Sequence, residues 1–146
     1  MIEVRPLEEA EVEAVTAQLP LHRLGAPGGE YLVAWEDDLP VGHAHVAWEH
    51  APPELQDVFV PEPLRRRGIG AALSCAFEAR ARERGHRLVG LEVAEDNTGA
   101  IALYERLGYV RTGDPPRRVV GTVQLRTGPL EVDDTLLRYE KALSTH

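Results

Sequence analysis

An arginine- and glycine-rich turn at residues 65–71, which reads Arg-Arg-Arg-Gly-Ile-Gly-Ala, carries the clearest chemistry in this 146-residue chain. It follows a predicted strand and opens a predicted helix, where free N–H groups and the helix dipole favour an anion. Gly68 and Gly70 let the backbone approach a phosphate without an intervening Cβ. Residues 61–90 hold seven Arg against three Glu, in a chain of net charge −8. The turn is therefore predicted to bind a diphosphate; a solvated arginine run beside an ordinary glycine turn is the alternative.

The common nucleotide-binding motifs fit this turn poorly. A P-loop needs Gly, four residues, Gly, Lys and then Ser or Thr, and this pattern is absent from the sequence. A dinucleotide-binding turn needs a third small residue where Leu73 stands, and it follows the first strand of a longer sheet. Here the turn lies in mid-chain, after a group of predicted antiparallel strands. A diphosphate carried by another kind of cofactor is favoured.

Two motifs together resemble the GNAT superfamily of acetyl-CoA-dependent N-acetyltransferases. Its first motif is Arg or Gln, two residues, Gly, one residue, and Gly or Ala, which the run RRRGIG from Arg65 matches. Its second motif resembles the stretch LEVAEDNTGAIALYERLGY, residues 91–109. Within the superfamily this stretch is most similar to the ribosomal-protein-alanine N-acetyltransferases, although Ala94 stands where those enzymes usually carry Arg.

The resemblance implies that acetyl-CoA is the co-substrate and that no metal is needed. Backbone amides of the turn would hold the pyrophosphate. The strand at residues 55–60 would splay from the strand at 88–94, which leaves edge amides free to pair with the pantetheine arm. The residues implied to contact the cofactor are Val58, Phe59, Val60, Arg65, Arg66, Arg67, Gly68, Ile69, Gly70, Ala71, Asn97, Ala100 and Tyr104.

The implied chemistry is direct attack of a primary amine on the thioester in a ternary complex. Tyr104 matches the family's general acid, and a phenol of pKa ~10 lies close to a thiol of ~8.5; its alternative role is packing on the apolar stripe of a helix. Glu92 matches the proposed base of the alanine acetyltransferases, acting through water. Asp57, on the neighbouring strand, is a rival base, and Glu54 is a weaker one. Asn97 is also a candidate helix cap.

The elements that must position these residues follow from hydrophobic periodicity and turn residues. The resulting order indicates an α/β fold, and the resemblance implies a GNAT-like mixed sheet of about six to seven strands with splayed central parallel strands and helices on both faces. We expect one acyl-CoA N-acyltransferase domain over residues 1–146. Helices are predicted at 7–15, 68–84 and 97–107, and strands at 2–5, 31–36, 41–49, 55–60, 88–94, 109–112 and 135–141, with 119–125 as a further candidate.

Composition limits the partners and the location. Sixteen basic against 24 acidic residues work against a general nucleic-acid or anionic-membrane partner. The N-terminus does not resemble a signal peptide, and no apolar stretch approaches the ~20 residues that span a bilayer. The single cysteine, Cys75, excludes an internal disulfide, so a cytoplasmic location is expected. His43 and His45 share a strand face, but two histidines are too few for a catalytic metal site.

The sequence therefore predicts an N-acetyltransferase that moves an acetyl group from acetyl-CoA to a primary amine, either a small molecule or a protein N-terminus. Two alternatives are a catalytically inactive CoA-sensing or partner-binding module with this fold, and a structural dimer module without ligand. A homodimer is compatible with catalysis, and residues 119–125 or the last strand offer an edge for it. Small amines, aminoglycoside-like compounds, amino acids and protein N-termini all stay open as acceptors.

Overall fold

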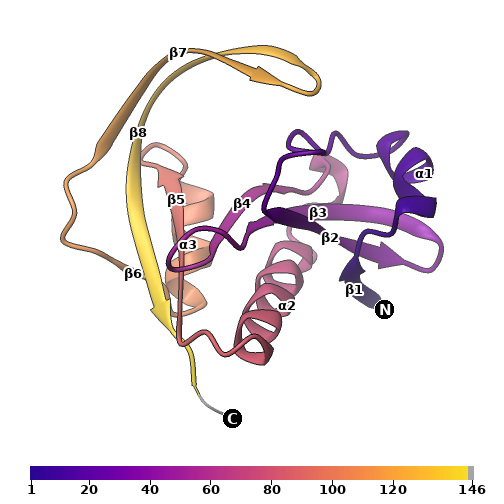
Figure 1. Ribbon diagram of the computed structural model, residues 1–146, viewed down its shortest axis with the longest axis horizontal. Coiled ribbons are helices and arrows are strands. Elements are labelled where there is room, and N and C mark those ends of the chain that lie inside the picture. Colours follow the sequence, from indigo (N-terminus) through magenta and orange to yellow (C-terminus); the bar gives the residue numbers. More distant parts are fainter. Residues whose placement is uncertain (145–146) are drawn as a thin grey trace.

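The computed structural model describes residues 1–144 as one twisted eight-stranded sheet with three α-helices (Figure 1). The strand order is β1-β2-β3-β4-β5-β8-β6, with β7 paired to β8. Of the helices in this part of the chain, none combines the length and the hydropathy that a membrane crossing needs. The elements are β1 (Ile2–Pro6), α1 (Val12–Thr16), β2 (Gly29–Glu36), β3 (Leu39–Ala47), β4 (Glu54–Phe59), α2 (Ile69–Glu83), β5 (Leu88–Ala94), α3 (Thr98–Arg106), β6 (Val110–Arg111), β7 (Arg117–Leu125) and β8 (Gly128–Ala142).

Strands β1 to β4 form the predicted antiparallel half of the sheet, with helices on both faces. Alternate residues of β2 point to opposite faces and join different cores. Leu32 and Ala34 pack in one buried cluster with α2 and α3, whereas Val33 and Trp35 pack in a second with Val15 of α1. The predicted two-sided arrangement is confirmed.

Helix α2 forms because its apolar residues recur at intervals of four. Ile69, Leu73 and Phe77 are each no more than 1% exposed and lie against the sheet. The helix begins after Gly68, whose φ of 82° is in the left-handed region that favours glycine, and Gly85 with φ 87° follows its end. The N-terminus of α2 is thereby placed directly after the end of β4.

The central parallel pair splays, as predicted. Strands β4 and β5 are paired only at Glu54 with Gly90 and at Leu55 with Leu91. On the other side of β4, the register with β3 shifts between His43 and His45. Asp57, with φ 45°, lies at this bulge. A bulge bends its strand, so the carboxyl end of β4 turns away from β5 and leaves its edge unpaired.

The last part of the sheet differs most from the sequence-based expectation. Between residues 113 and 133 the sequence offered only 119–125 as a further candidate strand, but β7 pairs with β8 from Arg117 opposite Leu136 to Leu125 opposite Gly128. This β7–β8 hairpin, orange to yellow in Figure 1, arches from the β5 side toward the segment before β2. The hairpin and the two-residue strand β6 raise the strand number to eight.

Candidate active site

A cleft of about 540 Å³ opens where the carboxyl end of β4, the N-terminus of α2 and helix α3 meet. It lies over the unpaired edge that the splay of β4 and β5 leaves. Every residue predicted to contact the cofactor lines it except Arg67. The lining residues are Val58, Phe59, Val60, Leu64, Arg65, Arg66, Gly68, Ile69, Gly70, Ala71, Asn97, Gly99, Ala100, Leu103, Tyr104 and Arg106.

The turn before α2 presents free amides to this cleft. The hydrogen bond from the Ala72 N–H to the Gly68 carbonyl, 3.0 Å, is the first of the helix. The N–H groups of the three preceding residues therefore have no partner within the helix. Arg66 holds a positive φ of 67°, a strained conformation for a side chain of its size. Such free amides beside a strained residue are suited to an anion.

The three arginines of the turn differ in their surroundings. Arg65 donates from Nε to the carbonyl of Val60 at 2.9 Å, which ties the turn to the end of β4. Arg67 pairs with Glu36 of β2 at 2.5 Å and turns away from the cleft. Arg66 lines the cleft and makes no hydrogen bond or ion pair within residues 1–144. Its guanidinium is therefore the one of the three most available to a bound anion.

Helix α3 places Asn97 and Tyr104 on the opposite wall. Asn97 caps the helix, since its Oδ1 accepts from the Ala100 N–H at 3.1 Å, as predicted. Tyr104 is 6% exposed, and its ring meets Tyr109 edge to face at 5.6 Å. Burial raises the pKa of Tyr104 to about 12, against a smaller lowering by Ser74. The hydroxyl therefore stays protonated through the neutral range and can act as a donor.

Glu92 is engaged elsewhere. Its two carboxylate oxygens accept from Nε and a terminal nitrogen of Arg117 at 3.0 and 2.6 Å. The Arg117 hydrogen bonds lower the pKa of Glu92, which makes it a weaker proton acceptor. Within residues 1–144 it is not part of the cleft lining. Glu54, the weaker candidate base, is likewise held by Arg138 at 2.8 Å.

Asp57 lies at the bulge, one residue before the cleft-lining Val58. Its side chain is 11% exposed and accepts three hydrogen bonds. The hydroxyl of Tyr31 donates to Oδ2 at 2.5 Å, and the backbone N–H of His22 donates to the same oxygen at 3.1 Å. The imidazole Nδ1 of His22 lies 2.8 Å from Oδ1. Burial and the bond to Asp57 raise the pKa of Tyr31, so this hydroxyl is a permanent donor.

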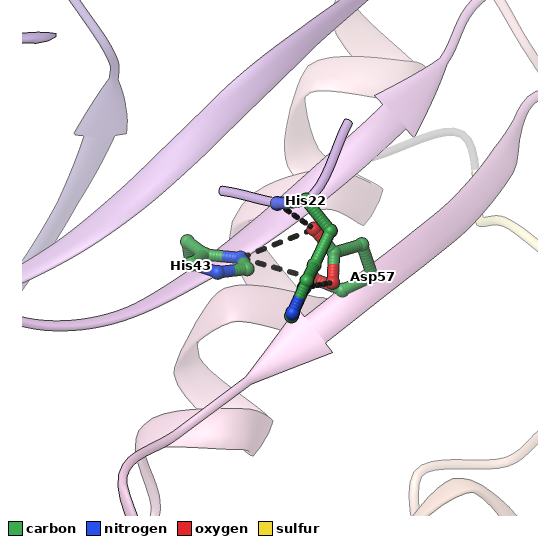
Figure 2. A group of neighbouring side chains, drawn as sticks. All are labelled: His22, His43 and Asp57. Carbon is green, nitrogen blue, oxygen red and sulfur yellow. Dashed lines mark hydrogen bonds and ion pairs between the residues drawn. The ribbon is translucent and has the colours of Figure 1, made fainter. Parts of the chain in front are cut away.

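His22, which binds Asp57, is a residue that no signal in the sequence marks. It lies in the Gly- and Pro-rich segment between α1 and β2, where no periodic pattern marks it. The fold brings it to Asp57, 35 residues away. Figure 2 shows His22, His43 and Asp57 converging from three separate segments.

His43 contacts the backbone of Asp57 and is a neutral imidazole. It is completely buried, and burial lowers its pKa to about 4. Its Nε2 accepts from the Leu21 N–H at 3.2 Å, so Nδ1 carries the proton and donates to the Asp57 carbonyl at 3.0 Å. The three ligand atoms of His22, His43 and Asp57 lie within 4.8 Å of one another. Both ring nitrogens of His43 are already used, so this set suits a hydrogen-bond network better than a metal ion.

Comparison with known proteins gives a match to one family model. The model of the acetyltransferase (GNAT) family matches residues 3–109. Mycothiol acetyltransferase from Geodermatophilus obscurus is 36% identical over 92 residues, which are 58% of this chain and 30% of that protein. The chain spans between 25% and 49% of the length of four curated relatives that it matches.

Solved structures share the fold at low identity. The ribosomal-protein-S18-alanine N-acetyltransferase from Escherichia coli superimposes with a TM-score of 0.74 at 19% identity, over 100% of this chain and 96% of that one. A protein from Salmonella typhimurium, described as an acetyltransferase with its cofactor acetyl-CoA, gives 0.72 at 18% identity, over 99% and 95%. With its two sequence motifs, its splayed sheet and the family match over residues 3–109, this chain belongs to the GNAT acetyltransferase family.

Proposed function

We propose that the protein is an N-acetyltransferase that transfers the acetyl group of acetyl-CoA to a primary amine. The observation that carries the proposal is the cleft itself. It joins the free amides at the start of α2, the unpaired edge of β4 and the protonated hydroxyl of Tyr104. An elongated ligand with a diphosphate at one end and a reactive acyl group at the other matches this order of groups.

The diphosphate would bind at residues 67–71, on backbone amides and beside the Arg66 guanidinium. Gly70 lines the cleft, and a Cβ there would lie 3.3 Å from Cδ2 of the cleft-lining Leu103, so a larger side chain would narrow the cleft. The pantetheine arm carries amides of its own, which can pair with the edge of β4 beyond Leu55, where β5 has turned away. The similar Salmonella protein holds acetyl-CoA, which supports this choice of cofactor.

Tyr104 would donate a hydrogen bond to the sulfur that leaves. Its raised pKa, about 12, makes full proton transfer to an exposed thiolate unfavourable, since a thiol has a pKa of ~8.5. A thiolate that departs into the same cleft is also desolvated, which raises the pKa of the thiol. The difference between that pKa and the pKa of Tyr104 is thereby smaller. The proton would therefore move late, as the C–S bond breaks.

The acceptor is proposed only as a primary amine, either a small molecule or a protein N-terminus. A cytoplasmic location and a homodimer stay predictions; analytical ultracentrifugation at micromolar concentration measures the latter. The E. coli structural relative acts on a ribosomal-protein alanine, and a peptide with a free N-terminal alanine is therefore one member of the acceptor panel.

The test has two arms. Calorimetry should show acetyl-CoA binding that weakens as salt rises, because the phosphates meet positive charge. Release of free thiol should then exceed the hydrolysis background for at least one compound in a panel of amines, amino acids and peptides. Binding without transfer to any amine would favour a CoA-sensing module, and no binding at all would contradict the proposal.

A further inference from the structure

We propose that His22 is the general base of the acetyl transfer, accepting the proton of the incoming ammonium at Nε2, with Asp57 as its positioning residue. This inference deepens the proposed function and rests on it. In this proposal neither Glu92 nor Asp57 takes the proton directly. The imidazole of His22 takes it, and the carboxylate of Asp57 orients that imidazole.

The hydrogen-bond geometry fixes which nitrogen of His22 is free. Nδ1 lies 2.8 Å from Oδ1 of Asp57, and an ionised carboxylate only accepts, so Nδ1 carries the proton. In the neutral ring the lone pair then lies on Nε2, for which residues 1–144 contain no hydrogen-bond partner. A histidine held by a carboxylate in this way is the arrangement that gives an imidazole a defined tautomer for proton transfer.

Among the described residues His22 lies just outside the cleft lining, and it adjoins the cleft through Phe59. His22 is 28% exposed in its side chain, and its ring meets the ring of Phe59 edge to face at 6.2 Å. Phe59 itself lines the cleft. In Figure 2 the imidazole extends from Asp57 toward the carboxyl end of the strand that carries Asp57. The imidazole ring thus adjoins Phe59, in the part of β4 that would hold the thioester arm.

The segment that carries His22 is fixed from two sides. Leu21 has φ 43°, which is strained for a branched side chain, yet it is fully buried and its N–H binds His43. From the other side, Arg126 at the tip of the β7–β8 hairpin donates from Nε to the Leu21 carbonyl at 3.0 Å. Its backbone N–H also donates to the His22 carbonyl at 3.3 Å. A surface loop fastened in this way can hold a catalytic side chain in one position.

The charged and titratable groups around the imidazole favour this role. Asp57 of β4 stabilises the imidazolium that forms when Nε2 takes a proton. His43 of β3 and Tyr31 of β2 are neutral at pH 7, because burial lowers the pKa of the first and raises that of the second. The Arg126 guanidinium is directed at the carbonyls of Pro20 and Leu21.

The acceptor nitrogen loses two protons during the transfer. Its ammonium gives the first proton to Nε2 of His22, and the nitrogen lone pair then forms the C–N bond. The C–S bond breaks, and its electron pair stays on sulfur. Tyr104 gives a proton to the thiolate. The tyrosine is then reprotonated by the second proton that the nitrogen loses. His22 then releases its proton to water, so the products are an amide, a thiol and one proton.

The test compares His22→Gln with Asp57→Asn and with His86→Gln as the control. His86 stacks on Trp48 and lies outside the cleft lining, so its loss should leave kcat/KM unchanged. Loss of a general base should lower kcat/KM about 100-fold or more at pH 7 and remove the acidic limb of its pH profile. The Kd of acetyl-CoA should stay within about twofold of wild type, since His22 touches no predicted cofactor contact except Phe59.

A nitrogen NMR measurement and chemical rescue separate catalysis from structure. Long-range ¹H–¹⁵N spectra of the free wild-type protein should show His22 protonated at Nδ1, and Asp57→Asn should abolish that tautomer preference. Added imidazole should restore activity to His22→Ala. Acetyl transfer that keeps its rate and pH profile in His22→Gln overturns the base assignment alone. A wild-type chain that binds acetyl-CoA but transfers to no amine overturns the proposed function and this assignment together.

Discussion

Replacement of Gly70 by valine tests whether the α2 turn holds the diphosphate. Gly70 is the second residue of α2 and lines the cleft. A Cβ at this position would meet Cδ2 of Leu103, another lining residue, at 3.3 Å, so a larger side chain would occupy space in the cleft beside the turn. Gly70→Ala adds one methyl group and Gly70→Val adds three carbons. The two variants should therefore obstruct the diphosphate to different degrees.

The expected effects on folding and on binding differ in size. Alanine gains up to about 1 kcal/mol of helix propensity over glycine. The tight contact with Leu103 offsets part of it, so the free energy of unfolding should change by less than about 1 kcal/mol. A hydrogen bond to a charged group contributes ~1.5–3 kcal/mol, and displacing the diphosphate breaks one or two of them. Loss of about 2–5 kcal/mol raises the Kd for CoA by about 30-fold to several thousand-fold.

Calorimetry with CoA and thermal unfolding with and without CoA measure the two effects separately. At 100 times the wild-type Kd, ligand stabilises the folded state by ~2.7 kcal/mol, which corresponds to a rise in Tm of about 5–10 °C. Gly70→Val should show almost none of this rise. Gly113→Ala, whose added Cβ meets nothing within 4 Å and whose site lies outside the cleft, should behave as wild type. A folded Gly70→Val that binds CoA as tightly as wild type refutes the placement of the diphosphate.

Three further predictions concern the proton-transfer groups. Tyr104→Phe should lower kcat for thiol release about 10- to 100-fold and leave the Kd of acetyl-CoA within about twofold; an unchanged kcat makes Tyr104 a packing residue. Glu92→Gln should alter kcat/KM less than about threefold, because Arg117 holds that carboxylate and lowers its pKa; loss of a limb of the pH profile would return the role of base to Glu92. His43 has a folded-state pKa of about 4, below the ~6.5 of an unfolded chain, so the unfolded state binds more protons between these values and stability falls as pH drops. Urea unfolding should show that the free energy of unfolding falls by about 2 kcal/mol more between pH 7 and pH 5 in wild type than in His43→Gln. Equal falls in the two proteins would contradict a buried, neutral His43.

The residues that line the cleft between β4, α2 and α3 could be predicted because their signals are local. The spacing of Ile69, Leu73 and Phe77 and the glycines that flank the helix determine α2, and the same glycines leave the amides at its start free. The tyrosine and the capping asparagine of α3 were read from a contiguous motif. Among the predicted contact residues only Arg67 does not line the cleft, because its guanidinium pairs with Glu36 of β2.

The hydrogen-bonded group of His22, Tyr31 and Asp57 could not be predicted, because it depends on strand register. His22 meets Asp57 only through a bulge that gives Asp57 a positive φ, and nothing local to either residue specifies that bulge. The segment that carries His22 is rich in glycine and proline and contains no helix or strand, so no periodic pattern marks the residue. Asp57 was a candidate from the sequence, but the imidazole of His22 that binds it was not.

The β7–β8 hairpin was underestimated for a different reason. Most residues of β7 are exposed, so the strand lacks the alternation of apolar and polar residues that marks a half-buried strand. The prolines at 115 and 116 also favoured a loop, yet β7 begins directly after them, at Arg117. Pairing with the long strand β8, and not burial, stabilises this element.

A crystal structure of the chain with acetyl-CoA tests the central claim most directly. The account predicts the diphosphate within hydrogen-bond distance of the amides at residues 67–71 and the thioester between Tyr104 and the carboxyl end of β4. Acetyl-CoA bound elsewhere, with the α2 turn empty, or a thioester on the far side of the sheet from Tyr104, would contradict it.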